Sequence, residues 1–481
     1  MKRGDEVILD IETIAFEGKS IARLDGVVVF VPGVIPGDTV RAQIRKVKSQ
    51  YAEAEAVEVT RASDLRVTPR CKYFGVCGGC KWQHVDYGAQ LEFKRRHVAD
   101  VLERIGGIRD VDVKETIGSE QAYFYRNKME FSFGTRWLSR EQYAAEKLSG
   151  PLNHRSDDTG LGLHLRGRFD KVLDIDECWL QSPSSNHILN AVRRFAMERC
   201  LSTYSTRTHT GYLRNLVIRE GKRTGETMVN VVTSEDRPDI MRELSERLAV
   251  ECPGVTTIVN NVTTRKAQVA IGEYERIYRG QGLITERLGN KIFRISANSF
   301  FQPNTLQAER LYETARRMAR LGKSDVVFDL YSGTGTIGVF IADEVSEVVG
   351  IELVESAVLD ARANAQLNGV TNCRFEIGDL MQKLTKDREW LYQRRQPTVV
   401  IIDPPRSGMH EKAIPGVLDL RPERIVYISC NPATQARDLK LLCSKGDYRI
   451  EEVQPVDMFP HTDHIENVVS LSRVEVVDQR T

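Results

Sequence analysis

The sequence predicts a multidomain chain with a small N-terminal β-barrel, a central α/β part and a C-terminal open α/β sheet. Residues 1–62 hold short β-rich runs separated by turn signals, and residues 63–295 mix short strands and helices around a cysteine-rich stretch. Residues 296–481 alternate strands with helices, which is typical of a parallel sheet covered by helices. Because a chain of 481 residues is too long for one hydrophobic core, we expect three domains with these bounds.

The composition is that of a globular protein, with 41% hydrophobic and 28% charged residues. No apolar run approaches the roughly 18 residues of a membrane helix. The opening MKRGDEVILD becomes acidic where a signal peptide would become apolar. Nine cysteines are few for this length and odd in number, which favours a reducing compartment. We therefore expect a cytoplasmic, monomeric protein that does not contact a membrane.

A net charge of +1 gives no overall attraction for nucleic acid, so any RNA site must be a local basic patch. Three segments are candidates: RAQIRKVK (41–48), FKRRH (93–97) and LVIREGKR (216–223). Each of them is equally compatible with an ordinary solvated face.

Four β-rich runs predict the N-terminal barrel. These runs are separated by the turn signals EGKS and PGVIPGD, and they read EVILDI, IARLDGVVVFV, TVRAQIRKV and YAEAEAVEVT. The cysteine-rich CKYFGVCGGCKWQH follows, and then the helical pattern AQLEFKRRHVADVLERI. In the central part, MEFSFGTRW and RNLVIRE alternate in the manner of half-buried strands.

The C-terminal part contains seven apolar runs of strand length. We expect strands at VVFDLY (326–331), EVVGIE (347–352), CRFEI (373–377), TVVIID (398–403), RIVYIS (424–429), RIEEVQPV (449–456) and IENVVSLSR (465–473).

A glycine-rich turn links the first of these strands to a helix. Gly333, Gly335 and Gly338 match the pattern G-x-G-x-x-G, and Glu352 ends the next strand. Glycines allow the backbone to approach a ligand closely, and the acid can accept hydrogen bonds from two ribose hydroxyls. The pattern fits NAD, S-adenosylmethionine or a purely structural turn.

Two strand tips carry reactive side chains. Asp403 ends one strand, and Cys430 ends the next strand, immediately before an Asn-Pro step. If those strands are neighbours, both residues stand at the edge of the sheet where ligands bind. The last strand returns through the short loop FPHTDH, which would bring Glu466, His464 and His461 toward the thiol. The alternatives are that Cys430 only packs and that Glu466 is a surface carboxylate.

Four cysteines have the spacing of a metal site. Cys71, Cys77 and Cys80 lie close together in the sequence, and Cys178 lies far downstream in DIDECWL. A site of four thiolates binds either zinc or an iron–sulfur cluster, and the spacing does not choose between them.

These segments together resemble the S-adenosylmethionine-dependent RNA uridine-5-methyltransferases. The likeness is strongest to the bacterial ribosomal-RNA enzymes of the RumA type, which carry a TRAM domain and an iron–sulfur cluster. It covers nearly the whole chain and rests on ARLDGVVVFVPGVIPGDTVRAQI, CKYFGVCGGCKWQHVDYGAQLEFK, NSFFQPN, DLYSGTGTIG, IIDPPRSG, SCNPAT and FPHTDHIENV. One departure is the segment 136–160, which is longer and more polar than the family pattern.

The resemblance implies an OB-like TRAM barrel, a central iron–sulfur and RNA-binding domain, and a Rossmann-like class I methyltransferase domain. It implies S-adenosylmethionine as methyl donor and a 4Fe–4S cluster on Cys71, Cys77, Cys80 and Cys178. The implied partner is RNA, which we expect to be 23S rRNA, with the T-loop of tRNA as the alternative.

The resemblance also implies a mechanism in which Cys430 adds to carbon 6 of uracil and activates carbon 5 toward the methyl group. Arg406 is a candidate for lowering the pKa of this thiol. A base then removes the proton from carbon 5. The family assigns that role to Glu466, although the ordinary pKa of His464, about 6.5, suits the task equally. The implied cofactor contacts are Gln302, Tyr331, Thr336, Glu352, Asp379 and Asp403, of which Asp403 is also a candidate for holding the polar edge of uracil.

Two other classes of protein remain compatible with the residues alone. The glycine-rich turn and the cysteines fit an NAD-dependent iron–sulfur oxidoreductase. The barrel and the basic patches fit an RNA-binding protein or chaperone without catalytic activity.

Overall fold

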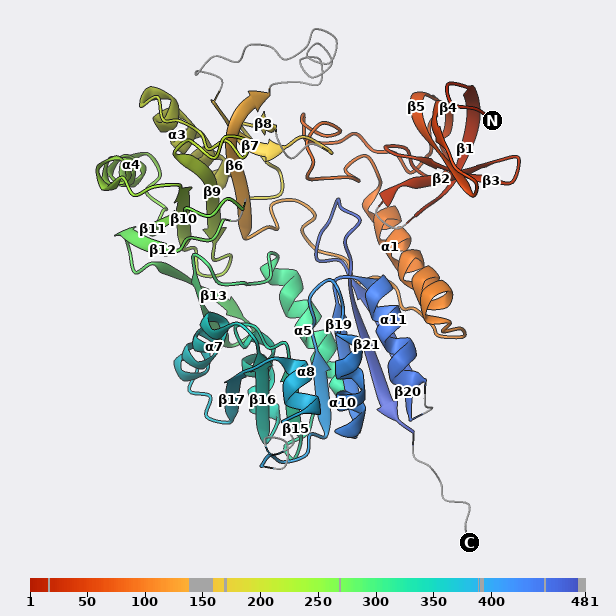
Figure 1. Ribbon diagram of the computed structural model, residues 1–481, viewed down its shortest axis with the longest axis vertical. Helices are drawn as coiled ribbons and strands as arrows, with labels where there is room; N and C mark the ends of the chain where they lie inside the picture. Colours follow the sequence, from red (N-terminus) through yellow and green to blue (C-terminus); the bar gives the residue numbers. More distant parts are fainter. Residues whose placement is uncertain are drawn as a thin grey trace.

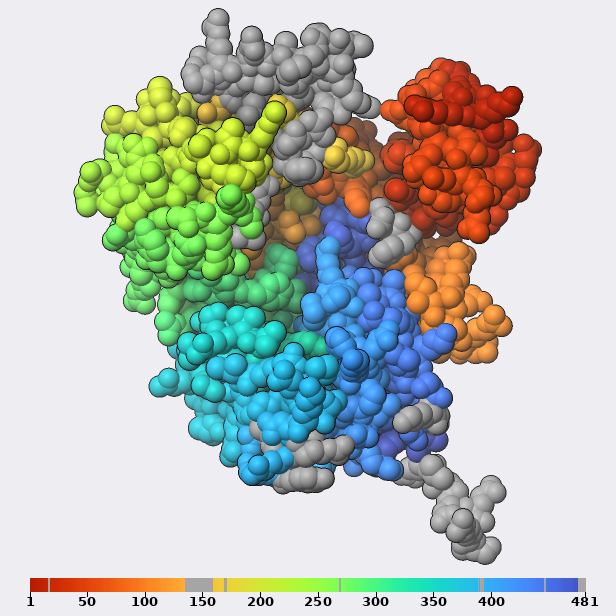
Figure 2. Space-filling view, viewed as in Figure 1, coloured from red at the N-terminus to blue at the C-terminus, as the bar shows by residue number. Residues whose placement is uncertain are grey.

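The computed structural model describes residues 1–481 except 16–17, 138–158, 168–170, 268–269, 388, 390–392, 445–446 and 475–481. The chain forms a barrel, a central α/β body and a C-terminal α/β body (Figure 1), and the space-filling view shows a hollow between them (Figure 2). The C-terminal body is called the catalytic body below, because it holds the residues that the sequence predicts for catalysis. Most of the insertion expected at 136–160 lies outside the described residues. None of the described helices has the length and apolar character needed to cross a lipid bilayer.

The N-terminal barrel is closed, with the strand order β1-β2-β3-β5-β4. Alternate residues of each strand fill its interior, which Leu9, Val29, Val40 and Ile44 occupy almost without exposure. The expected run IARLDGVVVFV is two strands, because Asp25 and the following glycine adopt positive φ and form a tight turn. The strands are β1 (Glu6–Ile14), β2 (Ser20–Leu24), β3 (Val27–Val31), β4 (Thr39–Val47) and β5 (Tyr51–Arg61).

The cysteine-rich segment leads into helix α1 (Tyr87–Val101), as the sequence predicts. The Asp86 side chain caps its first turn by accepting a hydrogen bond from the Ala89 N–H, and a π-helical turn (Leu102–Gly106) extends it. Helix α1 does not pack on the central body. It lies along the catalytic body, beside β20 (Tyr448–Val456) and α11 (Pro432–Cys443) (Figure 1).

The central body is a seven-stranded sheet in the order β12-β11-β10-β9-β6-β7-β8. Helices α3 and α4 pack on one face of it (Figure 1). Its elements are β6 (Lys128–Trp137), β7 (Thr159–His164), β8 (Val172–Asp174), α3 (Pro183–Glu198), β9 (Leu213–Glu220), β10 (Thr227–Thr233), α4 (Pro238–Glu251), β11 (Thr257–Val262) and β12 (Tyr274–Arg279).

Strand β9 differs from the half-buried strand expected for RNLVIRE, because all of its residues are buried. The reason is a contact with a distant part of the chain. The Arg219 guanidinium donates hydrogen bonds to the carbonyl oxygens of Ala297 and Ser299, so the loop that precedes α5 (Thr305–Ala319) covers this part of the sheet.

The catalytic body is a seven-stranded sheet in the order β17-β16-β15-β18-β19-β21-β20, parallel except for β21. All seven expected strands are confirmed to within a residue or two. The hairpin of β13 (Leu283–Leu288) and β14 (Lys291–Ser296) precedes the sheet. The other helices and strands of the catalytic body are β15 (Val326–Leu330), α6 (Thr336–Ile341), β16 (Glu347–Glu352), α7 (Glu355–Leu367), β17 (Cys373–Ile377), α8 (Leu380–Thr385), β18 (Val399–Ile402), α10 (Ile414–Asp419), β19 (Arg424–Ser429) and β21 (Glu466–Arg473).

Each of the three basic patches contains a residue with a structural partner that the sequence did not reveal. Lys94, in the patch 93–97, is 1% exposed and forms an ion pair with Asp457. Arg219, in the patch 216–223, is buried as described above. In the patch 41–48, Arg41 pairs with Glu6 and Glu58. The division of the chain at residues 62 and 295 stays a prediction.

Candidate active site and cysteine site

A cavity of about 1390 Å³ lies beyond the carboxyl ends of the strands of the catalytic sheet. The sheet order reverses between β15 and β18, and ligands bind at such a reversal in open α/β sheets. The eight residues that the sequence predicts for catalysis and cofactor binding all line this cavity: Gln302, Tyr331, Thr336, Glu352, Asp379, Asp403, Cys430 and Glu466.

The glycine-rich turn forms one wall of the cavity. Gly333 has a φ of +53°, and a Cβ atom there would meet nothing within 4 Å, so the backbone is open to a ligand at this residue. Gly335 and Gly338 serve a different purpose, because Cβ atoms there would lie 2.8 Å and 3.4 Å from the ring of Phe375. The turn therefore combines ligand access with internal packing.

Glu352 is fixed beside this turn. Its carboxylate accepts hydrogen bonds from the Gly333 N–H at 3.0 Å and the Val354 N–H at 2.8 Å. Asp379, at the end of β17, accepts a hydrogen bond from the Gln382 N–H and caps α8. Both carboxylates are thus held by backbone N–H groups while they line the cavity. They are suited to accept hydrogen bonds from a nucleoside.

Gln302 reaches the cavity on a loop that the central body holds. Asn127 donates hydrogen bonds from Nδ2 to the Gln302 carbonyl oxygen at 2.8 Å and to Thr305 Oγ1 at 2.9 Å. The same loop carries Phe300 to the mouth of the cavity, where its side chain is 68% exposed.

Cys430 and Glu466 lie next to each other across two strands. Strands β19 and β21 are antiparallel with Ser429 opposite Asn467, so the next residues in this register are Cys430 and Glu466. Both residues line the cavity. Glu466 is buried, and its pKa is raised well above the ordinary value by burial and then by the charge of Asp403.

The Cys430 thiol is half-buried, and burial is the main reason that its pKa is raised to about 11. The charge of Glu466 raises the pKa further. The Arg406 guanidinium opposes these effects by charge and by a hydrogen bond to the sulfur. Arg406 is the cation that favours the thiolate at this site.

Two more carboxyl groups make this end of the sheet acidic. Burial raises the pKa of Asp403 to about 7. Burial, with Asp403 as a neighbour, raises the pKa of Asp329 in β15 to about 8, and Asp329 Oδ1 has no hydrogen-bond partner. Asp329 was not among the residues predicted from the sequence, although a lone acid inside the apolar run VVFDLY is a detectable signal.

The two histidines of the FPHTDH loop have different surroundings. His464 lines the cavity, and its Nδ1 lies 3.5 Å from Arg406 Nη2. Burial lowers the pKa of His464. His461 does not line the cavity that contains the thiol, contrary to the expectation from the sequence. It is buried against α1 instead, because Gln90 bonds both its main-chain N–H and its ring.

Cys430 also lines a second cavity of about 620 Å³, together with Arg406 and His464. This cavity lies between the barrel, the cysteine-rich segment and the catalytic body. Besides those three residues, its lining includes Lys19, Lys81, Arg166, His97 and Asp463. The thiol therefore stands between a cavity that contains the glycine-rich turn and one that faces the barrel.

The four expected metal ligands come together at the edge of the central body. The charges of Cys77 and Cys178 affect the pKa values of neighbouring thiols of the set, so the four sulfurs lie within electrostatic range. Burial raises the pKa of Cys77 and of Cys80 to about 12 each. The Gly79 N–H donates to Cys77 Sγ at 3.4 Å, and Gln83 Nε2 donates to Cys80 Sγ at 3.2 Å. Across the described ranges, no three or more His, Cys, Asp or Glu side chains are arranged as ligands of one metal ion.

Two family models match the chain. The model described as tRNA (Uracil-5-)-methyltransferase matches residues 261–474, and the TRAM domain model matches residues 1–57. An RNA methyltransferase of Chlorobaculum tepidum, itself uncharacterized, is 47% identical over 478 residues, which is 98% of each chain. An uncharacterized RNA methyltransferase of Bacteroides thetaiotaomicron is 43% identical and covers 95% of this chain and 99% of its own.

A solved structure agrees in fold over the full length. The tRNA (uracil-54, C5)-methyltransferase of Pyrococcus abyssi, in complex with S-adenosyl-L-homocysteine, has a TM-score of 0.73 and 32% identity, and the match covers 97% of this chain and 100% of that one. These matches favour a methyltransferase over an NAD-dependent oxidoreductase and over an RNA-binding protein without catalytic activity. The chain belongs to the RNA (uracil-5-)-methyltransferase family, with an N-terminal TRAM domain, and is an RNA uracil methyltransferase.

Proposed function

We propose that this enzyme methylates carbon 5 of a uridine in 23S rRNA with S-adenosylmethionine, through a covalent bond between Cys430 and the uracil. The observation that carries the proposed chemistry is the register of β19 and β21, whereas the choice of 23S rRNA rests on the resemblance to the ribosomal-RNA enzymes that carry a TRAM domain and an iron–sulfur cluster. The register brings the Cys430 thiol and the Glu466 carboxyl together in a cavity that also contains the glycine-rich turn. A nucleophile, a base and a nucleoside-binding turn are the groups that this reaction requires.

The reaction balances with these groups. The Cys430 thiolate adds to carbon 6 of uracil, and the electrons of the C5–C6 double bond move toward carbon 5. S-adenosylmethionine supplies an electrophilic methyl group on a sulfonium. Carbon 5 takes this methyl group, and a neutral thioether leaves. Glu466 then accepts the proton of carbon 5, and the C6–S bond breaks to restore the double bond and the thiolate.

The thiolate is scarce in the free enzyme. With a pKa of about 11, the thiolate fraction of Cys430 is on the order of one part in 10⁴ at pH 7. Arg406 is the group that increases this fraction, because its charge and its hydrogen bond to the sulfur favour the anion. We therefore assign Arg406 to thiol activation.

Glu466 is a stronger candidate than His464 for the base. Burial and Asp403 raise the pKa of Glu466, which makes its carboxylate a stronger base than an exposed one. Burial and the nearby Arg406 lower the pKa of His464, which makes its ring a weaker base. Glu466 also lies opposite Cys430 in the strand register, where it would face the same pyrimidine ring.

The two cavities suggest how the substrates enter. S-adenosylmethionine would bind in the larger cavity, with Glu352 and Asp379 toward its nucleoside and Gln302, Tyr331, Thr336 and Asp403 around the rest. The uridine would approach from the second cavity, where Lys19, Lys81 and Arg166 suit phosphate groups. A base must leave its stack to reach Cys430, so a loop uridine is favoured over a paired one.

The residues around the four cysteines fit a 4Fe–4S cluster. Each cysteine binds a different iron in such a cluster, so its ligands stand farther apart than the four ligands of one zinc ion. The absence of a single-ion arrangement among the described side chains is consistent with this difference. The N–H···S bonds from Gly79 and Gln83 would stabilise thiolate ligands. When bound, the cluster would supply a rigid link between the cysteine-rich segment and the central body.

The tRNA T-loop is the second candidate substrate, because the solved relative from Pyrococcus abyssi acts on tRNA. The reaction is the same on both RNAs. We expect methyl transfer from labelled S-adenosylmethionine to a 23S rRNA fragment at a rate at least tenfold above the rate with tRNA transcripts. The reverse order would identify tRNA as the substrate.

We expect Glu466→Gln to form the methylated covalent adduct on unmodified uridine RNA but to release it slowly, because no carboxylate removes the proton of carbon 5. Loss of one general base typically costs about 10² to 10⁴-fold in turnover. Denaturing gels with labelled RNA detect the adduct. Cys430→Ser should form none, and turnover by this variant at the wild-type rate would contradict the mechanism.

The rate should depend on pH through the thiol. Below its pKa of about 11, the thiolate fraction of Cys430 rises tenfold per pH unit, so we expect kcat/KM to increase from about pH 6 to about pH 9. Arg406→Gln removes the group that lowers this pKa and should move the rise to higher pH. Profiles of both enzymes test this. A flat wild-type profile, or a shift to lower pH in Arg406→Gln, would show that another group limits the reaction.

Metal analysis tests the cysteine site. We expect anaerobically purified protein to contain iron and acid-labile sulfide in equal amounts, and Cys178→Ser to lose most of both. Cys443→Ser, which changes a cysteine in α11 away from the four, is the matched control and should retain them. Zinc in place of iron in the wild-type protein would overturn the assignment to a cluster.

A further inference from the structure

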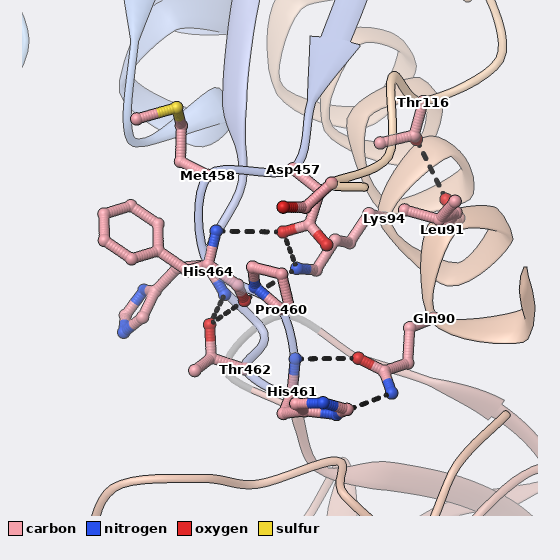
Figure 3. Close-up of polar contacts among 12 residues, drawn as sticks. Gln90, Leu91, Lys94, Thr116, Asp457, Met458, Pro460, His461, Thr462 and His464 are labelled. Carbon is pink, nitrogen blue, oxygen red and sulfur yellow. Dashed lines mark hydrogen bonds and ion pairs between the residues drawn. The ribbon is translucent and has the colours of Figure 1, made fainter. Parts of the chain in front are cut away.

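The loop between β20 and β21 places several side chains at the active site. It follows Val456 and ends at Glu466, and on the way it carries Phe459 and His464 into the lining of the larger cavity. Figure 3 shows this loop facing the side chains of Gln90 and Lys94 on helix α1. Glu466 is the first residue of β21, so the anchors of this loop hold the end of the strand that carries the proposed base.

The first anchor is a buried ion pair at the start of the loop. Lys94 Nζ lies 2.6 Å from Asp457 Oδ1, with the two side chains 1% and 0% exposed. Lys94 also donates a hydrogen bond to the Phe459 carbonyl oxygen at 3.1 Å, and Asp457 accepts one from the Phe459 N–H at 3.0 Å. Tyr87 donates to the other carboxylate oxygen of Asp457. Helix α1 thus fixes both the side chain and the backbone here.

The second anchor is His461. Its φ of +66° is a left-handed conformation that a histidine keeps only when its surroundings hold it. The His461 N–H donates to Gln90 Oε1 at 2.9 Å, and its ring Nδ1 lies 3.2 Å from Gln90 Nε2 (Figure 3). Its carbonyl oxygen accepts hydrogen bonds from the main-chain N–H groups of Lys81 and Trp82, which directly follow Cys80.

The His461 ring makes a third contact. Its centroid lies 4.3 Å from the ring of Tyr123, which packs edge-on against Trp179, the residue after Cys178. Both parts of the cysteine site therefore reach the same residue of the loop, five positions before Glu466. Within the loop itself, the Phe459 N–H donates to Asp457, and the Thr462 hydroxyl donates to the Phe459 carbonyl oxygen and accepts from the His464 N–H.

We propose that Gln90, Lys94 and His461 are positioning residues for methyl transfer: they hold the 457–465 loop so that Glu466 faces the carbon 5 proton of the target. The inference rests on the proposed function. None of the three residues lines the larger cavity, so each acts through the loop. Because Cys430 is placed by β19 and not by the loop, a loosened loop would impair proton removal more than addition of the thiol.

The test variant is Gln90→Leu, which keeps the size of a fully buried side chain and removes its bonds to His461 together with those to the carbonyl oxygens of Trp82 and Val85. We expect turnover to fall on the order of 10²-fold, as for a catalytic group displaced by about 1 Å. We also expect the methylated covalent adduct to accumulate on ordinary uridine RNA. A purely structural loss of folded protein would lower turnover without producing the adduct.

Leu248→Ala is the control, because Leu248 is buried in α4 on the far side of the central body (Figure 1). The turnover rates of the variants and of the wild-type enzyme are compared at the same folded fraction, which is measured by thermal unfolding. His461→Asn is a second variant, since asparagine tolerates the left-handed conformation but lacks the ring. Adduct accumulation in either variant supports the inference. If Gln90→Leu and His461→Asn both turn over like the control and accumulate no adduct, the inference is overturned. If instead the proposed reaction is wrong, the control and wild-type enzymes will show no methyl transfer either.

Discussion

Strand β21 enters the catalytic sheet antiparallel between β19 and β20, and its register with β19 decides which residue stands beside the Cys430 thiol. A slip of one residue would turn Glu466 to the other face of the sheet and bring a different side chain to the cavity. The register is well determined because β21 is buried along most of its length and pairs on both edges. Sheet packing therefore determines which residue faces the thiol, and the 457–465 loop holds the end of the strand where that residue lies.

The electrostatics of the site place limits on the state of the free enzyme. Asp329, Asp403 and Glu466 share one end of the sheet, and burial raises the pKa of each. Burying several charged carboxylates together costs more than protonating some of them. The thiol is protonated as well, so Arg406 faces a site that is less negative than its composition suggests. Entry of a cation and a polar substrate would favour the thiolate and the carboxylates, and would so make the site reactive.

Much of the site could be predicted from the sequence, because local patterns determine it. Apolar runs bounded by turns locate the strand tips, and the short FPHTDH loop forces β21 to return to the edge where Cys430 lies. Contacts between distant residues could not be predicted. From the sequence, Lys94 belongs to a basic patch, because its partner Asp457 lies 363 residues away along the chain. Arg219 likewise sits in a strand that looks half-exposed until the loop from the catalytic body covers it.

The central claim is that the Cys430 sulfur bonds to the pyrimidine that is being methylated. RNA with 5-fluorouridine at the target tests it, because fluorine at carbon 5 cannot leave as the proton does and the adduct is trapped. Mass spectrometry of the digested complex should find one modified peptide, in which Cys430 carries a pyrimidine with both fluorine and a methyl group. A modification on another residue, or methyl transfer to uridine RNA with no adduct on 5-fluorouridine RNA, would contradict the account.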